Sequence, residues 1–346
     1  MRKSVTLSTR AAEACLLLAA ALSLSPAALG MDRVRAESNI DAAVAKYGVT
    51  GRGVIVALLD RGIDLTNSDF MNAYGTTRIA AIFDLTDPTG ANAPGNTYGR
   101  GTIYTRQQID AALAGGPTLT TRDAVGHGTV TAGIATGNGR NLANLKYRGV
   151  ATEATIIVVK VTSEGAPAHD DQPAEPVFND ATVFPIAIDF VKNKAKELGL
   201  PAVMLLNLGS QGGPTDGTSD LARKIDGAVG AGIPGLVFVS GPGDDGGMAN
   251  RAGGNVAAGA TESIRIQKGL ASSLTFDLWY PGSDRFDVTI TTPSGTFGPY
   301  VSPATNADSA TLTTSDFLYY QLGSSRVFYG AQNGKREIFI RLTGAV

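Results

Sequence analysis

Cysteine is almost absent from this sequence, and its absence excludes several kinds of chemistry. The single cysteine, Cys15, lies in the apolar run from Ala14 to Leu24 that follows the basic residues near the start of the chain. Basic residues, a short apolar run and small residues near position 30 are typical of a secretory signal. We therefore expect residues 1–30 to be a signal peptide and the protein to be secreted, either extracellular or periplasmic. The remainder then has no disulfide, no thiolate metal ligand and no cysteine nucleophile.

Histidine and an excess of charge of either sign are also scarce. The two histidines, His127 and His169, are too few for a histidine-rich metal site. We interpret His169, which stands beside Asp170 and Asp171, as a solvated loop residue. With 29 basic and 31 acidic side chains, the formal net charge is −2. This balance gives no electrostatic footprint for nucleic acid or an anionic membrane surface, so we expect neither as a partner.

Short apolar runs alternate with helical patterns over the first two thirds of the chain. The predicted strands cover residues 54–59, 155–161, 202–208 and 235–240, and the predicted helices cover 38–47, a segment opening near 127, 185–198 and a segment capped by Ser219. Apolar strands that alternate with helices predict an α/β fold with a parallel sheet. Residues 72–122 are polar and rich in Gly and Pro, with one strand-like piece at 79–83 and a short helix at 105–113. We expect this segment to be a long surface excursion.

The pattern changes near residue 262. From there to Val346, apolar residues alternate with period two in 274–278, 286–290 and 338–342, and turn residues separate these stretches. Such alternation predicts an antiparallel β unit, which we interpret as a small sandwich. The predicted domains are therefore the signal at 1–30, an α/β domain at 31–261 and a β unit at 262–346.

Two residues stand where chemistry is common in α/β proteins. Asp60 closes the first buried strand, and ligands bind beyond the carboxyl ends of such strands. His127 begins a helix of small residues, between Gly126 and Gly128, which we expect to give the sheet and a ligand room to approach it. A carboxylate that orients an imidazole base is two thirds of a nucleophilic triad. The alternatives are that Asp60 only caps the turn at Gly62 and that His127 is satisfied locally at its helix end.

Five short blocks extend this pattern in a fixed order. They are Leu58-Leu59-Asp60-Arg61-Gly62-Ile63-Asp64, Gly126-His127-Gly128-Thr129 followed by Ala132-Gly133-Ile134-Ala135, Gly149-Val150-Ala151, Asn207-Leu208-Gly209-Ser210 and Ser240-Gly241-Pro242-Gly243-Asp244-Asp245-Gly246. Together they resemble the subtilisin-like serine peptidases, the subtilases, over about residues 48–260. The β unit resembles an insertion found in some secreted bacterial subtilases. The resemblance implies a secreted endopeptidase that hydrolyses peptide bonds in proteins.

The resemblance also implies roles for individual residues. Asp60 and His127 would be the catalytic pair, with Asp60 orienting the imidazole and His127 acting as general base and acid. Leu208, Gly209, Ser210 and Gln211 would bind the substrate backbone as an added strand. Asp244 would stand at the oxyanion position. In this reading the α/β domain at 31–261 is the N-terminal part of a peptidase domain.

One departure concerns the nucleophile. The subtilase serine lies in a Gly-Thr-Ser-Met-Ala-type block after the oxyanion block, and residues 247–346 contain no such block. Gly217-Thr218-Ser219 precedes the oxyanion block, and we interpret Ser219 as a helix cap. We therefore expect the sequence to break off inside the β insertion, and the fragment to have negligible activity, since losing the triad serine of subtilisin costs about 2 × 10⁶ in kcat.

A second departure concerns the oxyanion position. Subtilases usually have asparagine where this chain has Asp244, and an ionised carboxylate cannot donate a hydrogen bond to the oxyanion.

Asp69 falls where some subtilases place a calcium ligand, which makes calcium the one cofactor that the resemblance suggests.

Two other functions stay open at this point. A non-catalytic, secreted binding protein with the same fold would explain both the missing serine and Asp244. A nucleotide-binding domain is disfavoured, because Gly51-Arg52-Gly53 precedes its strand whereas the dinucleotide fingerprint follows one.

Overall fold

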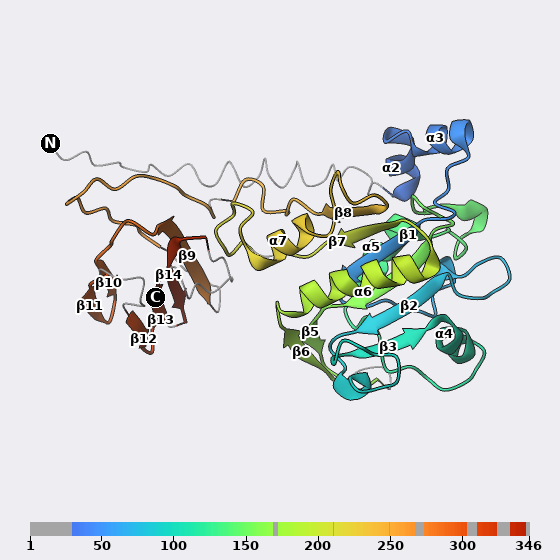
Figure 1. Cartoon of the computed structure of the whole chain (residues 1–346), viewed down its shortest axis with the longest axis horizontal. Coiled ribbons are helices and arrows are strands. Elements are labelled where there is room, and N and C mark those ends of the chain that lie inside the picture. Colours follow the sequence, from blue (N-terminus) through green and yellow to red (C-terminus); the bar gives the residue numbers. More distant parts are fainter. Residues whose placement is uncertain are drawn as a thin grey trace, which may run out of the picture. The chain divides into compact units, whose positions relative to one another are not determined.

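The computed structural model describes residues 30–168, 172–209, 211–248, 250–266, 273–302, 310–323 and 333–343. Contacts divide the chain into two compact units, Met1–Phe178 and Asn179–Val346 (Figure 1). The predicted signal peptide lies outside the described residues except for Gly30, and His169 also lies outside them. The domain boundary predicted between residues 261 and 262 stays a prediction.

The first unit is built on a sheet whose central strands are parallel. Strands β1 (Ile55–Asp60), β4 (Thr155–Lys160) and β2 (Ile79–Asp84) lie in the order β2-β4-β1, and β3 (Thr102–Thr105) pairs antiparallel with β2. In β1 every residue except Val56 is buried. The parallel register places Asp60 opposite Lys160 at the carboxyl ends of β1 and β4. The predicted apolar runs therefore form doubly covered strands, as expected of a parallel sheet.

The prediction for residues 72–122 was wrong in part. β2 is not a surface piece but an internal strand between β3 and β4, and five of its six residues are buried. Its apolar run is only five residues long, yet that is enough for a buried strand. The predicted short helix is confirmed as α4 (Arg106–Leu113), which begins with a capping box between Thr105 and Gln108.

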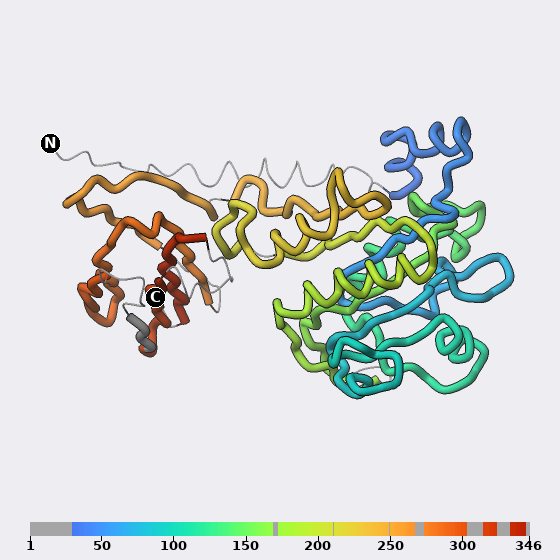
Figure 2. Tube along the Cα trace, in the orientation of Figure 1, coloured from blue at the N-terminus to red at the C-terminus, as the bar shows by residue number. Residues whose placement is uncertain are grey.

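Helices and a hairpin complete the first unit (Figure 2). They are α2 (Met31–Glu37), α3 (Ile40–Tyr47), α5 (His127–Thr136), the short turns η1 (Ser68–Phe70), η2 (Pro88–Gly90) and η3 (Ala143–Leu145), and the strands β5 (Thr162–Ala166) and β6 (Glu175–Asn179). The predicted helices at 38–47 and 127 correspond to α3 and α5. Neither α2 nor the two-stranded sheet of β5 and β6 was predicted.

The second unit begins with two parallel strands and two helices. They are α6 (Val183–Leu198), β7 (Ala202–Leu206), α7 (Asp220–Asp226) and β8 (Leu236–Ser240), with β7 parallel to β8. The structure confirms that α6 stops at Gly199, whose φ is 65°. It also confirms Ser219 as the cap of α7, because the Ser219 hydroxyl accepts the backbone N–H of Ala222 at 3.2 Å. The apolar face of α6 differs from the prediction, since Leu198 is exposed.

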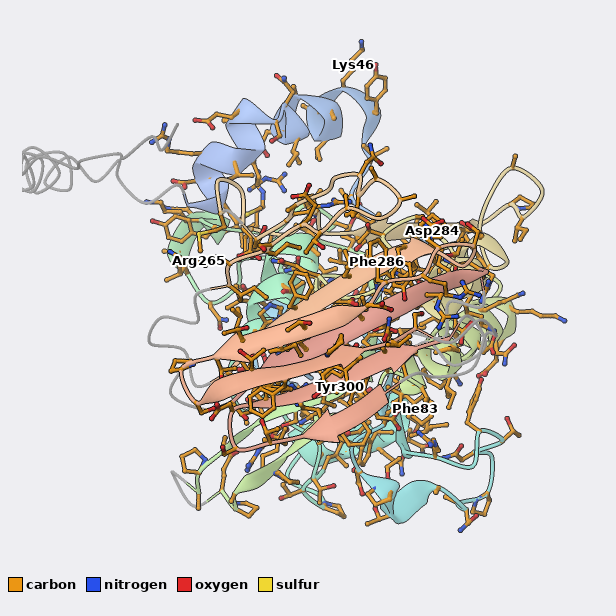
Figure 3. All side chains as sticks on the ribbon, turned by 90° about the vertical axis from the view of Figure 1, so that its left-hand side faces the viewer. Lys46, Phe83, Arg265, Asp284, Phe286 and Tyr300 are labelled. Atoms are coloured by element: carbon orange, nitrogen blue, oxygen red, sulfur yellow. The ribbon has the colours of Figure 1, made fainter. Side chains whose placement is uncertain are left out.

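Antiparallel strands make up the rest of the second unit, as predicted. They are β9 (Leu274–Pro281), β10 (Val288–Thr292), β11 (Gly295–Tyr300), β12 (Ala310–Thr313), β13 (Phe317–Leu322) and β14 (Lys335–Leu342). One sheet has the order β12-β13-β14-β9, and β10 pairs with β11. Two aromatic side chains labelled in Figure 3 belong to this core. Phe286 packs edge-on against Tyr280, and Tyr300 stacks on Tyr319. Aromatic side chains therefore fill the core that joins the larger sheet to the hairpin.

Candidate active site

Asp60 ends strand β1, and its side chain is almost completely buried. It is 1% exposed, because it is the last residue of a strand that is covered on both faces. Its Oδ1 accepts the backbone N–H of Arg61 at 2.8 Å and lies 2.6 Å from Nδ1 of His127. Asp60 and His127 lie 67 positions apart in the sequence, so the fold and not local geometry brings them together. The short distance satisfies the geometric requirement of a catalytic pair.

His127 is the first residue of α5, and a carboxylate outside the helix caps that helix. Asp123 accepts the backbone N–H of Gly126 at 3.0 Å with Oδ1, and the backbone N–H and hydroxyl of Thr129, each at 2.8 Å, with Oδ2. The Thr129 hydroxyl in turn accepts the backbone N–H of Asp64 at 2.8 Å. Asp123 therefore holds the start of α5 and ties it to the turn that follows β1. Asp123 was not predicted as a cap from the sequence, because it lies three residues before the N-cap position, which Gly126 occupies.

The two glycines beside His127 have different roles. A Cβ on Gly128 would lie 2.1 Å from the carbonyl oxygen of Gly62 and 3.2 Å from Oδ1 of Asp60. The expectation that Gly128 provides room is therefore confirmed. The same expectation for Gly126 was wrong, because a Cβ there would meet nothing within 4 Å. Gly126 is needed instead for its φ of 81°, a left-handed conformation that glycine adopts without strain.

The surroundings of Asp60 act on its charge in opposite directions. Burial raises the pKa of the Asp60 carboxyl, and the hydrogen bonds from His127 and the Arg61 N–H offset only part of that effect. The nearby charge of Asp123 adds to the rise. Within the described residues, Oδ2 of Asp60 has no hydrogen-bond partner.

The contact with Asp60 also assigns the imidazole nitrogens of His127. A carboxylate accepts but does not donate, so Nδ1 carries the proton that Asp60 accepts. Nε2 is then the nitrogen that can take a proton from another group. The side chain of His127 is 32% exposed, in contrast to Asp60, so the pair has one buried and one accessible member.

The other predicted site residues belong to the second unit. Leu208, Gly209 and Gln211 follow β7, and Asp244 follows β8 and is exposed, whereas Ser210 lies outside the described residues. Because β7 and β8 are parallel, the segments that follow them both begin at the carboxyl ends of the strands, on the same side of the pair. The side-chain amide of Gln211 donates to the carboxylate of Asp245, which follows Asp244 directly. The structure thus joins the predicted substrate-binding stretch to the predicted oxyanion block.

Calcium at Asp69 stays a prediction. Oδ1 of Asp69 accepts the backbone N–H of Asn141 at 3.0 Å, and the neighbouring Asn67 and Ser68 side chains contact the amide of Asn141. The described part of the chain holds no group of three or more histidine, cysteine, aspartate or glutamate side chains placed to bind a metal. Asp69 is therefore accompanied by amide and hydroxyl groups and not by further carboxylates.

A buried carboxylate at a strand end that contacts the imidazole of a helix-initial histidine has the geometry of the acid–base pair in triad-type hydrolases. Residues 51–250 match the family model described as the subtilase family of S8 peptidases. This chain therefore belongs to the subtilase family.

One solved structure has the same fold. The Clostridium perfringens CspB protease matches 89% of this chain with a TM-score of 0.62 and 24% identity, and this chain spans 59% of that protein's length. A structure described as an S41 psychrophilic protease (22% identity, TM-score 0.35) and sphericase (19% identity, TM-score 0.37) each match 58% of this chain and 50% of their own. No curated protein sequence matches significantly. None of the helices in the described residues has the length and apolar character needed to cross a bilayer.

Proposed function

We propose that this chain carries the acid–base half of a secreted serine endopeptidase that hydrolyses peptide bonds in proteins. The observation that supports this function is the 2.6 Å contact between Oδ1 of Asp60 and Nδ1 of His127 in a subtilase-family domain. Asp60 keeps the proton of the neutral imidazole on Nδ1 and stabilises the imidazolium formed during the reaction.

The reaction needs a serine hydroxyl within hydrogen-bonding reach of Nε2 of His127. That hydroxyl gives its proton to Nε2 while its oxygen bonds to the carbon of the scissile peptide, and Nε2 then returns the proton to the departing amine. Water repeats the sequence on the acyl-enzyme and releases the new carboxylate. No residue of the 346 stands in a block like that of the family's serine, so the proposal concerns a form of the protein in which such a block is present.

We further propose that the substrate backbone adds as a strand at residues 208–211. Leu208 is half-buried and Gly209 and Gln211 are exposed just beyond the end of β7, where the backbone of an added peptide strand can pair with them. Asp244 then lies where negative charge develops. An ionised carboxylate there opposes that charge, so the enzyme should be slow near neutral pH unless backbone N–H groups bind the oxyanion.

The test begins with the nucleotide sequence beyond codon 346, which either encodes an in-frame or frameshifted serine block or does not. The protein encoded with that block is then treated with a fluorophosphonate probe and with casein. Labelling and cleavage by the wild type, lost in His127→Ala and strongly reduced in Asp60→Asn, are the expected results. Equal labelling of the wild type and His127→Ala would contradict the assignment.

A second candidate is a secreted, non-catalytic binding protein that uses the same surface to hold a peptide. Asp244 favours it, because an ionised carboxylate at that position opposes the negative charge of an oxyanion. Its signature in the same experiment is binding of unfolded casein without labelling or cleavage, at an affinity that His127→Ala leaves unchanged.

A further inference from the structure

The hairpin of β5 and β6 contacts both chain segments that carry the proposed catalytic pair. Glu164 on β5 forms an ion pair with Arg61, the residue directly after Asp60. Glu175 on β6 forms ion pairs with Lys160 at 2.7 Å and with Arg122 at 3.4 Å. Arg122 lies on the loop that leads to His127. One hairpin therefore reaches the segment after Asp60 and the segment before His127.

Lys160 is buried at the end of β4, and its ammonium group binds the loop before His127. Its side chain is only 3% exposed, yet it sits in register with Asp60 at the edge where the site lies. Nζ of Lys160 donates to the carbonyl oxygen of Arg122 at 2.7 Å and also contacts Glu175. A buried ammonium needs such partners, because an uncompensated charge in the interior is costly.

The carbonyl of Arg122 also meets the turn after Asp60. A Cβ on Gly62 would lie 2.3 Å from this oxygen, so the backbone at Gly62 is packed directly against it. The Arg122 carbonyl therefore packs against Gly62, two residues after Asp60. Arg122 itself belongs to the loop that continues through Asp123 to His127. A shift of the Arg122 carbonyl would move both members of the pair relative to each other.

The guanidinium of Arg122 binds the segment just before β6. It donates to the side chain of Gln172 at 2.8 Å and to the carbonyl oxygen of Pro173, just before β6. Burial alone would raise the pKa of Glu175, but the hydrogen bonds from Lys160 and Ser163 and the charge of Lys160 outweigh it, so the pKa lies below its ordinary value. Glu175 is therefore a carboxylate anchored by several donors.

We infer that Lys160 and Glu175, assisted by the Arg61–Glu164 pair, are positioning residues through which the β5–β6 hairpin sets the geometry of Asp60 and His127. The inference rests on the proposed function for the roles of Asp60 and His127. The contacts themselves join the hairpin to the pair whether or not the protein cleaves peptides.

The test measures the imidazole of His127 directly by ¹⁵N NMR. The chain has two histidines, so a His169→Gln background leaves His127 as the only imidazole in the spectrum. The readout is the fraction of neutral imidazole with its proton on Nδ1, with Asp60→Asn as the reference in which that preference is lost. Glu175→Gln and Glu164→Gln should each convert the single dominant tautomer into a mixture. Asp41→Asn, which breaks the ion pair of buried Arg35 in the same unit, should leave it unchanged.

A double variant separates positioning from general stability. Lys160→Met with Glu175→Leu replaces a buried ion pair by apolar groups, a change that is often neutral for stability. It should stay folded, as a cooperative thermal transition would show, but still show the tautomer mixture, because the hydrogen bond from Lys160 to the Arg122 carbonyl is then lost. If Glu175→Gln fails to fold, the tautomer ratio of the double variant tests the inference in its place.

An unchanged tautomer in the double variant or in folded Glu175→Gln would overturn the inference. An equal loss in Asp41→Asn would also overturn it. Failure of the proposed peptidase function would appear separately, as a lack of fluorophosphonate labelling with the tautomer effects intact.

Discussion

Replacing Gly128 by alanine should destabilise the first unit although alanine is the better helix former. The new Cβ would lie 2.1 Å from the carbonyl oxygen of Gly62, a separation that real Cβ atoms do not adopt. That carbonyl cannot simply withdraw, because Gly62 is itself packed against the carbonyl of Arg122. Forcing an extra methyl group into a packed site costs about 1–3 kcal/mol. We expect the upper end of this range, because backbone atoms are in the way and not a flexible side chain.

Gly133 provides the matched control in the same helix. A Cβ there would meet nothing within 4 Å, so Gly133→Ala should gain about 0.5–1 kcal/mol from helix propensity alone. Gly128→Ala receives the same gain, so the stability difference between the two variants isolates the steric cost. This difference should be about 1–3 kcal/mol in favour of Gly133→Ala.

Urea unfolding followed by far-UV circular dichroism measures that difference. Trp279, the only tryptophan, lies in β9 of the second unit, so its fluorescence reports on a part of the chain that neither variant alters. Two variants of equal stability would refute the reasoning, since the close approach of α5 to the β1 turn would then not exist. A change in the Trp279 transition would show that the effect is not confined to the first unit.

Three further predictions concern charged residues. Asp123→Ala removes the cap of α5 and should lower the stability of the first unit by about 1–2 kcal/mol in thermal unfolding, with Asp123→Asn costing less because its amide oxygen still accepts. The folded-state pKa of Glu175 lies below 4.5, so its contribution is complete above pH 4.5 and lost as pH falls through the folded value. The stability difference between wild type and Glu175→Gln should therefore shrink in acid, and a difference that grew instead would contradict the sign. In a form that carries the serine block, Asp244→Asn should raise kcat near neutral pH, by up to about 10²-fold if this amide is the main oxyanion donor; an unchanged kcat would mean that backbone groups bind the oxyanion.

Strong local patterns made the first strand and the cap of α7 predictable from sequence. The run from Val54 to Leu59 is apolar throughout and stops at a carboxylate, which a buried parallel strand explains and a surface segment does not. Ser219 is a small hydroxyl residue directly before a helical pattern, and its hydroxyl does cap α7. In each case the signal and the structure lie within a few residues of each other.

The β2 strand and the β5–β6 hairpin were not predictable in the same way. β2 is short and surrounded by Gly- and Pro-rich sequence, and only its pairing with β4, which follows more than seventy residues later, makes it an internal strand. β6 begins Glu175-Pro176, and a charged residue followed by proline reads as loop. Pairing with β5 and the contacts of Glu175 with Lys160 make this segment a strand, and both are tertiary effects.

The role of Asp123 was missed because Gly126 was expected to provide space, whereas it is required for its left-handed backbone conformation. The glycines beside His127 were both expected to provide room, but only Gly128 does so, whereas Gly126 supplies a left-handed turn. That turn places Gly126 at the N-cap position without a side chain that could cap the helix. A capping group then has to come from further back, and Asp123 supplies it. The position of His127 thus depends on a glycine that bends the chain, a carboxylate that caps the helix and a second glycine that lets the helix approach Asp60, so changing any one of the three should disturb the same 2.6 Å contact.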